Sequence, residues 1–316
     1  MKTWLKSIVA IALMTLLFSV TEWRQVLSLV FKSSPAMVII GILLSVFGLV
    51  LSAHRWKILL RAFNSSPPLG LTVKLYWVGS FFSNFLPTNI GGDIARAVLT
   101  KPLCPLAQAA ASILVERLTG LSILLILAAI GIFYRPDYFA VPGVRLLIWA
   151  CILGMAAVIV LITTMGNRIA SILNQYLNRS DSILTKALKK IQKLVSSVNY
   201  YHGRPELVLL ALLLAIPFYV SVVAFQFVII AAVGANLGWV EVLFIAPLIP
   251  LVSLIPASIN SIGIAEGAFV VLYTQAGLTP EQALAAALLR RFILLIVSLF
   301  GGILWVFIRQ HPLEAT

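Results

Sequence analysis

Seven ionisable side chains interrupt stretches of this sequence that are otherwise strongly apolar. They are Asp93, Arg96, Glu116, Arg117, Glu266, Arg290 and Arg291, with four positive and three negative charges in all. An ionised group deep in a bilayer is costly unless it is paired or hydrated, so such groups usually mark a binding site or a transport pathway. Arginine donates two parallel hydrogen bonds to a phosphate, and a carboxylate attracts an ammonium group. The mixture therefore favours a phosphate-bearing lipid headgroup, including one that also carries an amine.

Two irregular stretches accompany these charges. Residues 85–96 read FLPTNIGGDIAR, and residues 256–267 read PASINSIGIAEG. Proline and glycine disfavour a simple spanning helix, and irregular backbone at membrane depth must be buried in protein or line a hydrated cavity. Short helices beginning near Gly91 and Gly263 would also direct their N-terminal dipoles at an anion. The candidate binding residues here are Asn84, Asn89, Gly91, Gly92, Ser258, Asn260 and Gly263, and the candidate hinges are Pro87 and Pro256.

The same residues have a structural alternative. In it, Asp93 pairs with Arg96 one turn away and Glu116 pairs with Arg290, merely to neutralise charge within a helix bundle. The asparagines would then only cap broken helices. Charged residues that are adjacent in the sequence point about 100° apart on a helix, so only one member of each such pair need face a cavity. The functional interpretation is favoured for the whole set, because apolar replacements would cost less than buried ion pairs.

Composition places these residues in a membrane protein. The chain has 316 residues, of which 61% are hydrophobic and 10% are charged, and its mean hydropathy is +1.06. A soluble core cannot use so much apolar side chain, so the expected fold class is all-α, a polytopic integral membrane protein. The net charge of +13 lies largely in short loops between apolar spans, which indicates contact with anionic lipid rather than with nucleic acid. Cys104, Cys151 and the scattered histidines form no disulfide or metal motif, and no cofactor is expected.

The pattern of apolar residues divides the chain into about six full spans and two re-entrant helical hairpins. The spans are expected at 4–20, 36–53, 105–134, 144–165, 207–233 and 280–309, and the hairpins at 71–100 and 240–276. A polar segment at 180–199 has apolar residues on one helical face and lysines on the other, as an amphipathic surface helix does. The N-terminal apolar run resembles a signal peptide but lacks a clear cleavage site, so a retained first helix is expected. A single transmembrane domain is therefore expected over residues 1–316.

The two hairpins are predicted to belong to an inverted repeat, with copies at about 71–134 and 240–309. From Asp93 to Arg117 is 24 residues, and from Glu266 to Arg290 is also 24. Basic loops at 54–74 and 168–204 are placed in the cytoplasm, together with both termini. Three crossings then separate the copies, so their topologies are opposite. This arrangement is expected of alternating-access carriers, because inward-open and outward-open states become near images of each other.

Three stretches resemble the signature sequences of a known family. FFSNFLPTNIGGDIARA, SILVERLTGL and IPASINSIGIAEGAF are similar to those of the lysylphosphatidylglycerol synthase transmembrane family, and the resemblance covers nearly the whole chain. Its best known members are the flippase regions of bacterial multiple peptide resistance factors, in which a soluble aminoacyl-transferase domain follows the membrane part. The matching residues are Asn84, Pro87, Gly91, Gly92, Asp93, Arg96, Glu116, Arg117, Gly120, Pro256, Gly263 and Glu266.

The resemblance implies translocation of a glycerophospholipid, such as aminoacylated phosphatidylglycerol, between leaflets. This sequence ends at Thr316 without a transferase domain, so lysine addition to a lipid is not expected. Forms that lack the transferase resemble proteins tied to polyprenyl-phosphate sugars, hopanoids or other lipids, which widens the range of substrates.

We therefore expect a lipid flippase, not an enzyme, that moves an anionic or aminoacylated phospholipid through a charged cavity at the membrane midplane. Translocation of a polyprenyl phosphate or a polyprenyl-linked sugar is the first alternative. A membrane-embedded lipid-phosphate transferase, with Asp93 or Glu116 as base, is the second. The sequence has no G-x-x-x-x-G-K loop, so transport would be passive or driven by an ion or proton gradient.

The expected location is the cytoplasmic (inner) membrane of a prokaryote. The expected partner is a membrane phospholipid or a polyprenyl-phosphate lipid, with no nucleic acid. A homo-oligomer and a separate lipid-modifying enzyme are left open as further partners.

Overall fold

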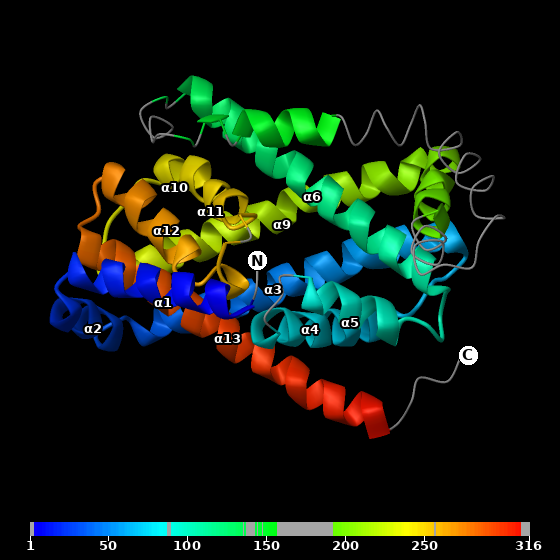
Figure 1. Ribbon diagram of the computed structural model, residues 1–316, viewed down its shortest axis with the longest axis horizontal. Coiled ribbons are helices and arrows are strands. Elements are labelled where there is room, and N and C mark those ends of the chain that lie inside the picture. Colours follow the sequence, from blue (N-terminus) through cyan, green and yellow to red (C-terminus); the bar gives the residue numbers. More distant parts are fainter. Residues whose placement is uncertain are drawn as a thin grey trace.

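The protein is built from helices that run mostly along one direction (Figure 1). The computed structural model describes residues 3–86, 90–134, 136, 143, 145–146, 148–156, 192–255 and 257–310. All regular secondary structure in these residues is helical, which confirms the all-α fold class. Pro87, Asn89 and Pro256 lie outside the described residues, as does most of the expected surface helix at 180–199, of which only 192–199 is described, as helix.

Four helices are long and apolar enough to cross a bilayer. They are α3 (Pro35–Leu60), α6 (Leu106–Tyr134), α9 (Pro205–Ala232) and α13 (Pro280–Gln310). Proline stands at the first position of α3, α9 and α13, where it removes no helical hydrogen bond and its fixed φ favours the helix. A bent pair of helices at the N-terminus brings the spans in the described residues to four or five. The remaining expected span, at 144–165, lies partly outside the described residues.

The helices α3 and α9 form the most extensive packing contact of the bundle. Gly41 of α3 lies against Phe225 and Ile229 of α9, and Gly48 lies against Ser221. Small residues let two backbones approach closely, which is the usual basis of helix association in a membrane. The helices α4, α6 and α13 pack against this pair.

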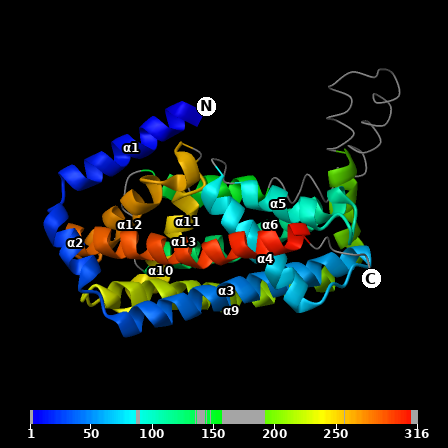
Figure 2. The same ribbon diagram turned by 90° about the horizontal axis from the view of Figure 1, so that it is seen from below.

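The first apolar stretch is a bent pair of helices and not a straight span. The two helices, α1 (Thr3–Ser19) and α2 (Trp23–Phe31), meet at an angle of 92°. Figures 1 and 2 show α1 beginning near the middle of the long axis and running towards one end, where α2 turns back to α3. Leu13 of α1 lies against Gly263, so the helix covers the second irregular stretch.

The first hairpin consists of α4 (Leu69–Phe85) and α5 (Gly91–Leu99), and it precedes α6. It corresponds to the hairpin expected at 71–100, and its second arm begins at Gly91, near which a short helix was expected. Gly79 and Gly92 make the close approach possible, because a methyl group on Gly92 would overlap the carbonyl oxygen of Gly79 and the Oγ of Ser83. The glycine pair therefore fixes how α5 lies on α4.

The second hairpin consists of α10 (Trp239–Ile245) and α11 (Leu248–Val252) in one arm and α12 (Ile264–Gln275) in the other. The short 3₁₀ helix Ile259–Ser261 precedes α12. Asn260, Ser261 and Gly263 all have positive φ, a conformation that costs energy for a residue with a side chain and often occurs at functional sites. Two further 3₁₀ turns, Arg61–Phe63 and Tyr200–Gly203, lie outside the hairpins.

The two hairpins lie towards opposite ends of the long axis. Figures 1 and 2 both show α4 and α5 on one side of the centre and α10, α11 and α12 on the other, with the long helices running past both. The charged residues identified from the sequence lie on the second arms of these hairpins and on the long helices that follow them.

Candidate functional site

The tips of the two hairpins contact each other. The side-chain amide of Asn260 donates to the side-chain oxygen of Asn84 at 3.3 Å and to its backbone carbonyl at 3.4 Å. These two asparagines are 176 residues apart in the chain. The sequence suggested helix capping as their alternative role, and the structure instead places them at the junction of the hairpins.

The first cluster of charges joins α5 to α6. Arg96 donates to Asp93 Oδ1 and to Glu116 Oε2, both at 2.8 Å. The side chains of Arg96 and Glu116 are each only 5% exposed. The Asp93–Arg96 pair of the structural alternative is therefore present. The Glu116–Arg290 pair of the same alternative is wrong, because α5 packs directly on α6 and brings Arg96 to Glu116.

Aromatic rings and a hydroxyl group surround this cluster. The Arg96 guanidinium lies 4.3 Å from the ring centre of Tyr76 and 5.1 Å from that of Trp56. The Tyr76 hydroxyl donates to Glu116 Oε1 at 2.9 Å. Ring faces and carboxylates together compensate a cation that is out of contact with water. Neither aromatic residue was predicted from the sequence, because an aromatic side chain in an apolar helix carries no distinctive signal.

Arg55 is a further buried cation that the sequence analysis did not identify as a site residue. It is 2% exposed and donates to the carbonyl of Ala211 at 3.1 Å, the carbonyl of Glu116 at 3.1 Å and the hydroxyl of Thr119 at 3.0 Å. Its position within a basic run suggested a role at the membrane surface. The signal that would have found it is its helical register with Gly48 and Ser52, because small residues mark the packed face of a membrane helix.

Arg117 is the exposed member of this cluster. Its side chain is 50% exposed, and its Nη2 lies 2.5 Å from Asp93 Oδ2. It lines three pockets, of which the inner one includes this cluster. The inner pocket, of about 510 Å³, is lined by residues that include Arg55, Tyr76, Asp93, Arg96, Glu116 and Arg117. Both members of the adjacent pair Glu116 and Arg117 therefore face this cavity.

The second cluster of charges joins α12 to α13. The Glu266 carboxylate accepts from the backbone N–H of Gly263 at 2.7 Å and from Arg291 Nε. Glu266 is 1% exposed. Glu266 lies in the first turn of α12. There its carboxylate accepts a hydrogen bond from a backbone N–H that has no partner within the helix, and its negative charge interacts favourably with the helix dipole. Arg291 also reaches the carbonyl of Ser261 at 3.5 Å, so the pair anchors the strained tip to the long helix.

The two clusters follow the same plan. In each, a carboxylate in the first turn of the short helix pairs with an arginine of the next long helix. In the first copy these are Asp93 and Arg117, and in the second they are Glu266 and Arg291. The two ion pairs are similar but not identical in spacing, because the partner of Glu266 is Arg291 and not Arg290, which stands 24 residues after it.

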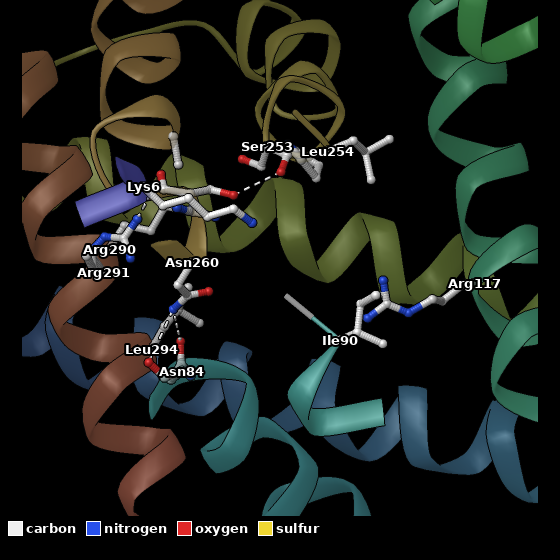
Figure 3. Close-up of a pocket in the computed structure, with 13 residues that line it drawn as sticks. Lys6, Asn84, Ile90, Arg117, Ser253, Leu254, Asn260, Arg290, Arg291 and Leu294 are labelled. Atoms are coloured by element: carbon white, nitrogen blue, oxygen red, sulfur yellow. Dashed lines mark hydrogen bonds between the residues drawn. The ribbon is translucent and has the colours of Figure 1, made fainter. Parts of the chain in front are cut away.

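The central pocket lies between the hairpin tips, with a volume of about 630 Å³. Its charged lining residues are Lys6, Arg117, Arg290 and Arg291, and no carboxylate of the described residues lines it. In Figure 3, Lys6, Arg290 and Arg291 lie together on one side, and Arg117 extends from α6 on the other. Asn84 and Asn260 form part of the lining. Its size falls within the usual range for ligand sites, about 300–1,000 Å³.

The remaining predicted residues support these pockets without lining them. Gly91 and Gly92 lie at the contact of α5 with α4, and Gly263 lies against α1. Ser258 is 2% exposed, and its hydroxyl has no hydrogen-bond partner among the described residues. Lys6, which was not among the predicted site residues, also lines the central pocket.

The sequence also matches a family profile along almost its whole length. The profile is that of the lysylphosphatidylglycerol synthase TM region, and it matches residues 3–302. The chain belongs to this family. The match includes both hairpins, both charge clusters and Lys6. No curated protein and no solved structure matched in the same comparisons.

Membership in the lysylphosphatidylglycerol synthase TM family bears on where the protein is located and on the class of molecule with which it is connected. The apolar helices and the family together make this an integral membrane protein. The family also connects the protein with membrane lipids.

Proposed function

We propose that this protein moves a phosphate-bearing lipid between the two leaflets of a membrane. The observation that carries the proposal is the central pocket, where four cationic side chains surround a cavity at the meeting point of two hairpin tips. Arginine and lysine hold phosphate through charge-assisted hydrogen bonds. A cationic cavity within an apolar bundle gives a headgroup a polar environment while it crosses the hydrocarbon region.

The arrangement of the hairpins supports alternating access. Each hairpin approaches the centre from its own end of the bundle, and each precedes a long helix that supplies an arginine to the pocket. We take the two as copies of an inverted repeat, with re-entrant tips at the midplane. Rocking one copy against the other would open the pocket to one leaflet at a time.

An apolar groove favours a lipid over a soluble anion. It lies between α5 and α6, has a volume of about 330 Å³, and is lined by Ile90, Asp93, Ile94, Ala97, Ala110, Ile113, Leu114 and Arg117. Ile90 and Arg117 also line the central pocket. A phosphate held by Arg117 could thus extend its hydrocarbon chain along the groove into the bilayer, where chain and groove are both apolar.

A transport assay tests this function directly. The protein is reconstituted into vesicles that contain a tail-labelled fluorescent phosphatidic acid, and a membrane-impermeant quencher reports which leaflet the label occupies. We expect the protected fraction to fall relative to protein-free vesicles. Arg117→Gln removes the cation that lines the central pocket, the inner pocket and the groove. It should slow this exchange by about tenfold or more, the usual loss for a charged contact of about 1.5–3 kcal/mol.

The control is Arg24→Gln, because Arg24 is exposed on α2 and stacks on Trp23 away from the pockets. It should transport as the unmodified protein does. Equal protection in vesicles with and without protein would overturn the proposal. A change in lipid mass during the assay would favour the transferase alternative instead.

Cross-linking the hairpin tips tests the alternating-access part. In Asn84→Cys/Asn260→Cys, a short bis-methanethiosulfonate reagent, which forms a disulfide with each cysteine and releases methanesulfinate, should join the tips and stop transport. Reduction should restore transport, because the side chains at these positions are in contact. Transport that continues in the cross-linked protein would show that the tips need not separate.

The native cysteines allow this experiment with one further change. Cys104 is 5% exposed between α5 and α6, and burial raises the pKa of its thiol to about 11. The reactive form is the thiolate, so near neutral pH the protonated thiol of Cys104 should not compete for the reagent. Cys151 is partly exposed and is replaced by serine in all variants.

A further inference from the structure

Every carboxylate oxygen of the two charge clusters already accepts a hydrogen bond or an ion pair. Asp93 uses one oxygen for Arg96 and the other for Arg117. Glu116 uses its two oxygens for Arg96 and Tyr76. Glu266 uses its oxygens for Gly263 N–H and Arg291, as described above. An ammonium group on a substrate would have to displace an internal cation to reach any of them.

The cations of the central pocket are less fully compensated. Lys6 and Arg290 both line the pocket, and neither has a hydrogen bond or ion pair with another described residue. Glu266 is within electrostatic range of Arg290, but its oxygens are occupied. Arg291 is neutralised by Glu266 and Arg117 by Asp93. The pocket lining therefore includes two cations, Lys6 and Arg290, that form no ion pair with a carboxylate of the described residues.

Two cations that line the same pocket without an ion-pair partner repel each other, and a bound anion would relieve this repulsion. A phosphodiester supplies one negative charge. A phosphate monoester supplies about 1.5 to 2 at neutral pH, with three acceptor oxygens, and thus matches the two cations more closely. An aminoacylated phospholipid would bring its own cations to a pocket lined by cations, which is a repulsive contact.

We infer that the headgroup taken by the central pocket is a terminal phosphate or diphosphate without an amine. The inference rests on the proposed transport function and narrows its substrate. It separates this chain from an aminoacyl-lipid carrier, and it selects polyprenyl phosphates and phosphatidic acid over phosphatidylglycerol and zwitterionic lipids. Lys6 and Arg290 are the residues that set this preference, since they hold the uncompensated charge.

The test compares headgroups on identical labelled tails. Reconstituted vesicles carry phosphatidic acid, phosphatidylglycerol, lysyl-phosphatidylglycerol or phosphatidylcholine, and a fifth set carries a labelled polyprenyl phosphate. We expect the two phosphate monoesters to exchange about tenfold faster than phosphatidylglycerol, which corresponds to about 1.4 kcal/mol. Inorganic phosphate added on both sides should compete only weakly, because it lacks the chain that occupies the α5–α6 groove.

Two further measurements test whether charge causes the preference for phosphate monoesters over phosphodiesters. Lowering the pH from about 7.5 to about 5 protonates a phosphate monoester once, so its advantage over the diester should shrink. Arg290→Gln should reduce the same advantage, whereas Arg24→Gln should leave it intact. Equal exchange of phosphatidylglycerol, or exchange of lysyl-phosphatidylglycerol at the monoester rate, overturns this inference while the transport function stands. Exchange of no lipid above the protein-free rate refutes the function itself.

Discussion

Alanine at position 92 is expected to abolish transport and to destabilise the protein strongly. In the folded structure a methyl group on Gly92 would occupy the space of the Gly79 carbonyl oxygen and of Ser83 Oγ. The carbonyl belongs to the backbone of α4 and cannot rotate away, so α5 must move off α4. Overpacking of this kind costs about 1–3 kcal/mol and sometimes more, and we expect the upper end here.

The Gly92→Ala variant should lose transport even under conditions in which it remains folded. Asp93 and Arg96 follow Gly92 directly on α5, and both reach α6 from there. Displacing α5 would separate these side chains from Glu116 and Arg117 and would open the inner pocket. Transport should therefore be lost even at temperatures where the variant stays folded. The measurements are thermal unfolding in detergent and lipid exchange in vesicles.

Two other glycines provide matched controls for this change. Gly70 in α4 and Gly267 in α12 have nothing within 4 Å of an added methyl group. Alanine there should leave transport unchanged and be neutral or stabilising by up to about 1 kcal/mol, since glycine disfavours a helix. A Gly92→Ala variant with normal unfolding and transport would show that the close α4–α5 approach is not required.

Replacing Arg96 by glutamine is expected to produce the largest loss of stability among the charged positions. Arg96 is the common partner of Asp93 and Glu116, and it is 4% exposed. Removing one member of a buried ion pair leaves an uncompensated charge and costs about 3–5 kcal/mol. Asp93 would keep Arg117, but Glu116 would keep only the Tyr76 hydroxyl. Urea unfolding followed by tryptophan fluorescence measures the change.

A double variant distinguishes lost charge compensation from lost packing. In Arg96→Gln/Glu116→Gln the stranded carboxylate is neutral, so a substantial part of the stability should return, although transport should not. If the double variant is as unstable as the single one, the stacking of Arg96 on Trp56 and Tyr76 is the dominant contribution. Arg24→Gln serves as the exposed control and should change stability by no more than about 0.5 kcal/mol.

The sequence allowed the elements of the site to be predicted but not all of their contacts. Asp93, Glu116 and Glu266 stand out because carboxylates are rare in apolar helices. Their spacing to the following arginines predicted an internal repeat, but it pointed to Arg290, and the structure pairs Glu266 with Arg291. The partner of Glu116 could not be predicted, since it depends on which helix packs on α6, and helix order in space is a tertiary property.

Two cationic residues of the pockets, Arg55 and Lys6, were not predicted as site residues for a related reason. Arg55 lies in a run with His54 and Lys57, and only the rotation of α3 about its axis decides which of these side chains turns inward. Lys6 reaches the central pocket because α1 and α2 are bent by 92°. Nothing in the residues between those helices specifies such an angle, because the packing of α1 on the second hairpin determines it.

In the proposed carrier, the hydrogen bonds from the Asn260 amide to Asn84 limit how firmly the two hairpin tips can be held together. Hydrogen bonds between polar side chains of membrane helices average about 0.6 kcal/mol, which is close to thermal energy at room temperature. Such a contact aligns the tips when they meet but does not hold them shut. Opening would then need no nucleotide hydrolysis, and the net direction of lipid movement would follow the difference in lipid concentration between the leaflets.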